Sequence, residues 1–172
     1  DFLKVASASI TDLALMDATN KASYRLDCPI VVSTGGSTMD EIHACLGMMG
    51  ENVKALLHCV SEYPCPVDRC NLQMIRTLRD EFADHIAIGY SGHETGIAPT
   101  LAAVAMGARV VERHITLDRA MWGSDQSASL EPTGLIRMVR DIRAIEAAMG
   151  DGVKRVTEGE AACMAKLRRV KS

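Results

Sequence analysis

Residues 86–118 read IAIGYSGHETGIAPTLAAVAMGARVVERHITLD, and this stretch indicates the fold. It begins with a short apolar run at 86–88 and continues through a polar turn into a small-residue helical pattern that stops at Gly107. A second apolar run follows at 110–111. Short continuous apolar runs are typical of buried parallel strands, and glycine is common where a helix ends. The stretch therefore predicts one β-α-β unit with two parallel strands.

The same order of apolar run, polar turn and helical pattern recurs along the chain. Further runs lie at 3–6, 30–32 and 55–57, so successive runs begin about 25 to 30 residues apart, the period of βα units with right-handed crossovers. The expected helix starts are Thr11, Ser37 or Thr38, Asn71, Thr95 or Gly96, and Pro132. Five units therefore occupy residues 1–150 as one α/β domain.

Two architectures accommodate five such units. A closed TIM-type (β/α) barrel of eight units needs about 250 residues, so a chain of 172 residues matches the last five units of such a barrel. A free-standing, five-stranded doubly wound sheet is the alternative. In either case, we expect the polar and basic residues 151–172 to form a C-terminal extension that packs on the outside of the barrel.

The composition excludes several classes of partner. With 19 basic and 22 acidic residues and no long run of either sign, the chain lacks the charge pattern of a nucleic-acid or anionic-membrane binder. No apolar run approaches the roughly 20 residues that span a bilayer. Six cysteines at irregular spacing, without a C-x-x-C motif, predict reduced thiols in a cytoplasmic protein.

Polar residues follow every predicted strand, and two of them are histidines one βα unit apart. His93 and His114 should end neighbouring strands, and the carboxyl ends of parallel strands meet at one edge. Two imidazoles at that edge can share one divalent cation, with water or substrate oxygens completing its coordination. His58 also ends a strand but has no evident ligand partner, so we interpret it as structural.

Two further features at this edge suit an anionic ligand. Lys4 lies within an apolar run, where an ammonium group is costly unless it meets an anion. Residues 33–36, Ser-Thr-Gly-Gly, supply hydroxyl and backbone N–H groups ahead of a helix. The long polar loop at 118–126 carries the only tryptophan and is a candidate lid or substrate grip.

Several motifs together resemble the sialic acid synthase family, the phosphoenolpyruvate-dependent synthases of nonulosonic acids. They run in order through nearly the whole chain: STG at 33–35, HCVSEYP at 58–64, GYSGH at 89–93, ERHITLD at 112–118 and GSDQSASLEP at 123–132. The resemblance implies a βα barrel of which this chain holds the last five units, the first three being absent.

The resemblance also implies a reaction and roles for ten residues. Phosphoenolpyruvate condenses with the open-chain aldehyde of an N-acylated hexosamine such as N-acetylmannosamine, and water attack releases phosphate. His93 and His114 would bind Mn²⁺ or Mg²⁺, and Glu112 would orient or deprotonate the attacking water. The implied substrate contacts are Lys4, Ser7, Ser33, Ser61 and Ser91 for phosphoenolpyruvate, and Tyr63 and Asp125 for the amino sugar.

The chain departs from the family pattern at several places, among them Ser61, where some members have asparagine. Residues 7–9 read Ser-Ala-Ser where the family has an acidic residue, and Gly92 stands where an aspartate is usual, so we expect Glu94 to supply a replacement charge. No antifreeze-like C-terminal domain follows the barrel units. The residues alone also leave open another metal-dependent βα-barrel lyase or hydrolase, or a non-catalytic part-barrel.

Five barrel units leave two strand edges and an inner face without partners. Candidate inward-facing residues are Val5, Val31, Leu56, Ile88 and Val110. Because exposed aliphatic side chains forfeit about 1.5 to 3 kcal/mol each, we expect either a homodimer formed through the open face or a longer chain whose own units close the barrel.

Overall fold

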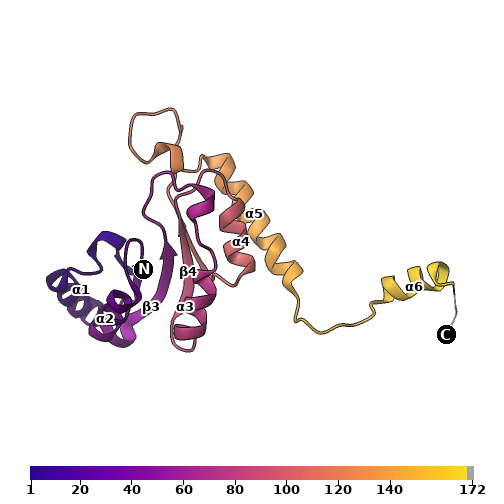
Figure 1. Ribbon diagram of the computed structural model, residues 1–172, viewed down its shortest axis with the longest axis horizontal. Helices are drawn as coiled ribbons and strands as arrows, with labels where there is room; N and C mark the ends of the chain where they lie inside the picture. Colours follow the sequence, from indigo (N-terminus) through magenta and orange to yellow (C-terminus); the bar gives the residue numbers. More distant parts are fainter. Residues whose placement is uncertain (170–172) are drawn as a thin grey trace.

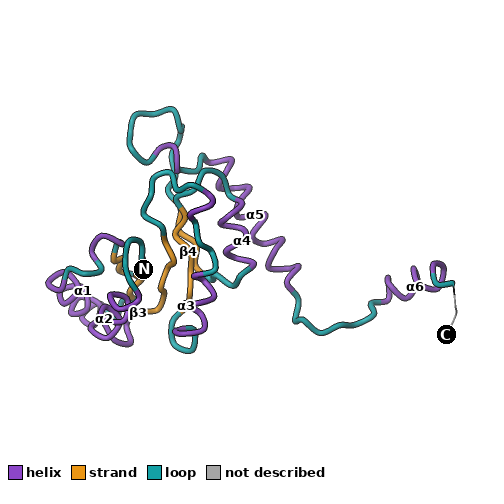
Figure 2. Tube along the Cα trace, in the orientation of Figure 1, coloured by secondary structure: helices purple, strands orange, loops and turns teal. Residues whose placement is uncertain are grey.

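The computed structural model describes residues 1–169, in which five parallel strands form one sheet (Figures 1 and 2). The strands are β1 (Leu3–Val5), β2 (Ile30–Ser33), β3 (Val53–Cys59), β4 (Ala87–Gly92) and β5 (Val110–Arg113). The helices are α1 (Leu13–Leu26), α2 (Met39–Met49), α3 (Met74–Phe82), α4 (Ala98–Ala105), α5 (Pro132–Met149) and α6 (Glu158–Leu167).

The spatial order of the strands is the order of the chain, β1-β2-β3-β4-β5. A doubly wound sheet reverses its strand order at a switch point, whereas a βα barrel adds each strand to the same side of the last. The described strands show no reversal. The structure therefore confirms the part-barrel and excludes the open doubly wound sheet.

The core lies between the sheet and its covering helices. It contains alternate strand residues such as Val5, Leu56 and Ile88, packed against helix residues such as Ile42 and Leu78. Burial of these aliphatic side chains is the main source of stability for the described domain.

Strand register assigns the opposite, concave face. Lys4 pairs with Val31, and Gly89 pairs with Val110. Because successive strand residues point to opposite faces, Val31 and Val110 face inward as predicted. The same alternation corrects the prediction for Val5, Leu56 and Ile88, which all face the helices.

Helix starts follow local capping chemistry. The side chain of Thr38 caps α2, and Glu41 completes a capping box. Thr38 is one of the two caps predicted for this helix. α5 begins at Pro132, as predicted. Asp12 rather than Thr11 caps α1, since its carboxylate accepts from the Leu15 backbone N–H at 3.0 Å.

Helices α3 and α4 begin three and two residues later than the latest predicted starts. Asn71 has φ 44°, a left-handed conformation that no helix can include, so α3 begins at Met74. Gly96 likewise has φ 86°, and α4 begins at Ala98 with proline in its first turn. The sequence pattern therefore predicts both helices correctly but does not predict the turns that precede them.

The C-terminal segment extends away from the sheet instead of packing on it (Figure 1). Among residues 151–169, only Met164 is half-buried and the others are exposed. This corrects the predicted packing: α6 carries mainly alanine and charged side chains, which gain little free energy from burial. Residues 170–172 of the predicted extension lie outside the described residues. Through residue 169, no helix is both long enough and apolar enough to cross a membrane.

His58 makes stability depend on pH. It is 5% exposed, and Nε2 donates to the Cys70 carbonyl at 2.8 Å, which supports its structural interpretation. Burial lowers the pKa of His58 below its usual value, although carbonyl contacts with Cys70 and Asn71 oppose the shift. The unfolded chain therefore takes up this proton at higher pH than the folded chain, and stability is lost as pH falls below about 6.5.

We predict that His58→Gln, which retains a donor for the carbonyl, flattens this dependence. Urea unfolding at pH 7.5 and 5.5 should show a smaller loss of unfolding free energy in the variant than in the native protein. His85→Gln, at an exposed position, is the matched control and should follow the native profile. Parallel profiles for native protein and His58→Gln would contradict the assignment.

Candidate functional site

The carboxyl ends of the strands bring polar side chains onto the concave face. Cys59 pairs in register with Ser91, and Ser91 with Glu112, so these residues form one row across β3, β4 and β5. Ser33 ends β2 opposite Leu57, two residues before Cys59. The register therefore places chemically active groups from four strands along one edge.

Glu112 lies between a hydroxyl and an ammonium group. Ser91 Oγ donates to Glu112 Oε1 at 2.7 Å, and Lys4 Nζ lies 3.4 Å from Oε2. Lys4 belongs to the first strand and Glu112 to the fifth, so this ion pair spans the concave face. Its side chains are 27% and 41% exposed, and such pairs contribute little to stability. The informative feature is that the two charged groups meet on the concave face.

A tight cluster of small polar groups lies where β1, β2 and β3 end. Ser7 Oγ accepts from the Gly35 backbone N–H at 2.9 Å and donates to Cys59 Sγ at 3.4 Å. Ser61 Oγ lies 3.9 Å from the same sulfur. Nearby Ser33 is buried, and its Oγ has no hydrogen-bond partner within residues 1–169. Unsatisfied buried hydroxyls are rare, and this one suits a polar ligand at the cluster.

The two predicted metal ligands lie side by side. The ring centroids of His93 and His114 are 5.2 Å apart, and the Tyr63 ring lies 4.2 Å from His93 and 5.7 Å from His114. His93 Nδ1 donates to the Val60 carbonyl at 3.0 Å, which leaves Nε2 as its free donor atom for a cation. His114 Nδ1 lies 3.6 Å from Asp125 Oδ2. Metal-binding histidines typically have their second nitrogen oriented by such a partner.

This donor set fits a cation held by two imidazoles. Through residue 169, no group of three or more His, Cys, Asp or Glu side chains has a metal-binding arrangement. The remaining coordination positions would therefore go to water or substrate oxygens, which suits an exchangeable Lewis acid better than a structural metal.

Cys59 links the serine cluster to the histidines and was not predicted as a site residue. Its sulfur lies 3.8 Å from His93 Nδ1. Burial raises the pKa of the Cys59 thiol, but hydrogen bonds with His93 and Ser7 outweigh it, and the net pKa is lowered. Burial lowers the pKa of His93, yet its contacts with Cys59 and Val60 raise it overall. The overlooked signal was the position of Cys59 at the carboxyl end of the third strand.

Glu94 does not supply charge to the site. Its side chain is fully buried, and Oε1 lies 2.9 Å from Arg113 Nη1. Because successive residues of an extended chain alternate, Glu94 points away from the face that His93 occupies. The predicted replacement charge is therefore wrong, and Glu112 and Asp125 are the carboxylates at this edge.

Nine of the ten predicted site residues lie near the carboxyl end of a strand or in the loop after it, and Lys4, in the middle of β1, reaches this edge through its contact with Glu112. The contacts above join them into three groups that share this edge: Lys4, Ser91 and Glu112; Ser7 and Ser61, with Ser33 nearby; and Tyr63, His93, His114 and Asp125. Their individual roles stay predictions.

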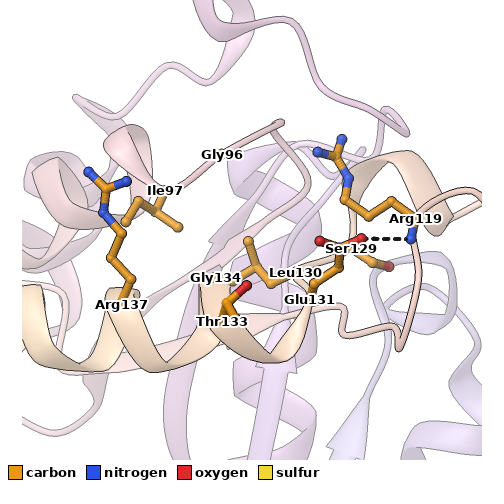
Figure 3. Close-up of a pocket in the computed structure, with 9 residues that line it drawn as sticks. All are labelled: Gly96, Ile97, Arg119, Ser129, Leu130, Glu131, Thr133, Gly134 and Arg137. Carbon is orange, nitrogen blue, oxygen red and sulfur yellow. Dashed lines mark hydrogen bonds between the residues drawn. The ribbon is translucent and has the colours of Figure 1, made fainter.

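A separate pocket lies beside this edge, between the starts of α4 and α5 (Figure 3). Figure 3 shows the side chains of Arg119 and Arg137 on opposite sides of it, and the Arg119 backbone N–H donates to Glu131 at 3.1 Å. None of the ten predicted site residues lines this pocket. It is therefore a neighbour of the candidate site and not part of it.

The fold is part of a βα barrel, and its polar side chains gather at the carboxyl ends of the strands. Comparison with known proteins makes the assignment specific. Residues 1–154 match the model of the NeuB family, and the chain belongs to that family. The resemblance noted in the sequence is thereby confirmed.

Several of the relatives are named as synthases of sialic and related acids. The chain is 42% identical over 169 residues to N-acetylneuraminate-9-phosphate synthase of Mus musculus, covering 96% of this chain and 45% of that protein. It is 41% identical over 162 residues to N,N'-diacetyllegionaminic acid synthase of Campylobacter jejuni, covering 91% and 47%. The chain thus spans about half the length of the curated relatives it matches.

Solved structures agree with the fold. The N-acetylneuraminic acid synthetase of Leptospira borgpetersenii superposes with a TM-score of 0.83 at 32% identity, covering 98% of this chain and 59% of that one. A truncated 3-deoxy-D-arabino-heptulosonate 7-phosphate synthase of Thermotoga maritima, at 15% identity and a TM-score of 0.68, shares the fold alone.

Gly35 tests the packing of the serine cluster. A Cβ atom at this position would lie 2.1 Å from Ser61 Oγ and 2.8 Å from both Cys59 Sγ and Ser7 Oγ. We predict that Gly35→Ala lowers the unfolding free energy by about 1 to 3 kcal/mol through overpacking, measured by urea denaturation. Gly47→Ala, in α2 with nothing near its Cβ, is the control and should gain up to about 1 kcal/mol. A Gly35→Ala variant as stable as native would show that the cluster is looser than described.

Proposed function

We propose that the protein condenses phosphoenolpyruvate with the open-chain aldehyde of an N-acylated hexosamine, giving a nonulosonic acid and phosphate. Carbon 3 of phosphoenolpyruvate forms the new bond to the aldehyde carbon, and the aldehyde oxygen takes up a proton. Water adds to carbon 2, and the bond from that carbon to the phosphate oxygen breaks. The observation that carries the proposal is the pairing of His93 and His114 beside Glu112 and Lys4 at one edge.

His93 and His114 would hold Mn²⁺ or Mg²⁺. Lewis-acid polarisation of the aldehyde oxygen is the chemistry that such a cation supplies when bound. The Val60 carbonyl orients the imidazole of His93, and Asp125 lies near that of His114. Both rings thus keep one nitrogen available for coordination.

Charge and hydroxyl groups along the concave face would bind phosphoenolpyruvate. Lys4 offers an ammonium group, and the serine cluster offers hydroxyls, including the unsatisfied Oγ of Ser33. Ser7, Ser61 and Ser91 complete the set. Fixed donors placed around a phosphate and carboxylate compensate the negative charge without reorganising during the reaction.

Glu112 would take the proton of the attacking water. Ser91 and Lys4 fix both of its oxygens on the concave face, at the same edge as the histidine pair. A positioned carboxylate is a suitable general base for this step.

Tyr63 and Asp125 would contact the acceptor sugar. The Tyr63 ring packs on His93 and remains 44% exposed, as a sugar-stacking surface requires. Two relatives carry an N-acetyl or N,N'-diacetyl product in their names, which supports an N-acylated acceptor such as N-acetylmannosamine. We further propose a cytoplasmic homodimer.

The proposal predicts phosphate release by the full-length protein given phosphoenolpyruvate, N-acetylmannosamine and Mn²⁺. Glu112→Gln should lower kcat at least about 100-fold, while His93→Ala and His114→Ala should abolish dependence on Mn²⁺ and remain folded. His43→Ala, an exposed helix position, is the control and should match native activity.

Three results would contradict the proposal. Absence of phosphate release with every N-acylated hexosamine tested, phosphorylated or not, favours another metal-dependent lyase or hydrolase. Metal-dependent turnover retained in both histidine variants contradicts the metal assignment. Full activity in Glu112→Gln contradicts its role as base.

A further inference from the structure

A buried ion pair lies directly behind the two histidines. Glu94 follows His93 and Arg113 precedes His114, so each member of the pair adjoins one imidazole in the chain. Arg113 Nη1 lies 2.9 Å from Glu94 Oε1, and the side chains are 1% and 0% exposed. The pair points toward the helices while the histidines point into the mouth.

Every polar oxygen of the Glu94 side chain has a partner. Thr100 Oγ1 donates to Oε1 at 2.7 Å, beside the Arg113 contact. Tyr90 Oη donates to Oε2 at 3.0 Å. A buried charge with all its hydrogen bonds satisfied holds one conformation, because every alternative leaves a polar group unpaired.

Arg113 ties this carboxylate to three backbone segments. Its Nη2 donates to the Glu94 carbonyl at 2.6 Å and to the Ala128 carbonyl at 3.2 Å. Nη1 donates to the Gly96 carbonyl at 2.8 Å. One guanidinium therefore joins the end of β4, the turn before α4 and the end of the loop that carries Asp125.

We propose that Glu94 and Arg113 are positioning residues that hold His93 and His114 at the spacing at which both bind one divalent cation. The proposal rests on the metal site of the proposed function. Loss of groups that orient metal ligands typically weakens metal binding 10- to 100-fold. Lysine does not replace arginine at such a site, because an ammonium group lacks the planar fork of donors.

The test is the Mn²⁺ affinity of the full-length protein, measured by the electron paramagnetic resonance signal of free Mn²⁺. Arg113→Lys and Glu94→Gln should each bind at least about tenfold more weakly than native protein. The double variant should lose less than the two single losses combined, because both act through one junction. Arg79→Lys is the matched control, because Arg79 Nη1 donates to the Met106 carbonyl at 2.8 Å, away from the site. The Mn²⁺ affinity of this variant should equal that of the native protein.

Tyr90→Phe decides the matter if the charge variants fail to fold. It removes only the hydroxyl that bonds Glu94 Oε2, and a folded variant should bind Mn²⁺ measurably more weakly, by less than about tenfold. If Arg113→Lys and Glu94→Gln fold and bind Mn²⁺ as tightly as native protein, the proposal is overturned. If they do not fold, native Mn²⁺ affinity in Tyr90→Phe overturns it. Losses that simply add in the double variant also overturn it. A native protein that binds no Mn²⁺ refutes the metal site of the proposed function, and the positioning role with it.

Discussion

Parallel strand pairing is the constraint on which the rest of this structure depends. Since all five strands run in the same direction, their carboxyl ends meet at one edge. The register then places Cys59, Ser91 and Glu112 in one row, with Lys4 across the face from Glu112. Residues separated by more than one hundred positions in the chain become neighbours without any special local feature.

Because side chains alternate along each strand, neighbouring residues lie on opposite faces of the sheet and have different partners. After β4, His93 faces the concave side and Glu94 faces the helices. At the end of β5, His114 faces the concave side and Arg113 faces the helices. The face that carries polar groups for ligands is thus backed by a buried ion pair, in which both carboxylate oxygens of Glu94 accept hydrogen bonds. Such a pair is weak support for overall stability, but it restricts the positions of the loops that bear the histidines.

Much of this arrangement can be predicted from the sequence. The apolar runs and their period predict the strands and their order, and residues directly after each run predict the edge that carries the histidines. Alternation along the strand could have predicted that Glu94 faces the helices. The sequence does not show that Arg113, on another strand, is its partner. The role of Cys59 depends on distances to Ser7 and His93, which pattern and propensity do not contain. The late start of α3 likewise depends on a left-handed Asn71.

The most direct measurement of the central claim is the anomalous scattering of Mn²⁺ in crystals of the full-length protein grown with that metal. The claim is that the strand ends form one site centred on His93 and His114, whose rings lie 5.2 Å apart. The predicted result is a single strong peak within coordination distance of a nitrogen atom of each ring, beside Glu112. A peak bound elsewhere, or by only one of the two histidines, would contradict it.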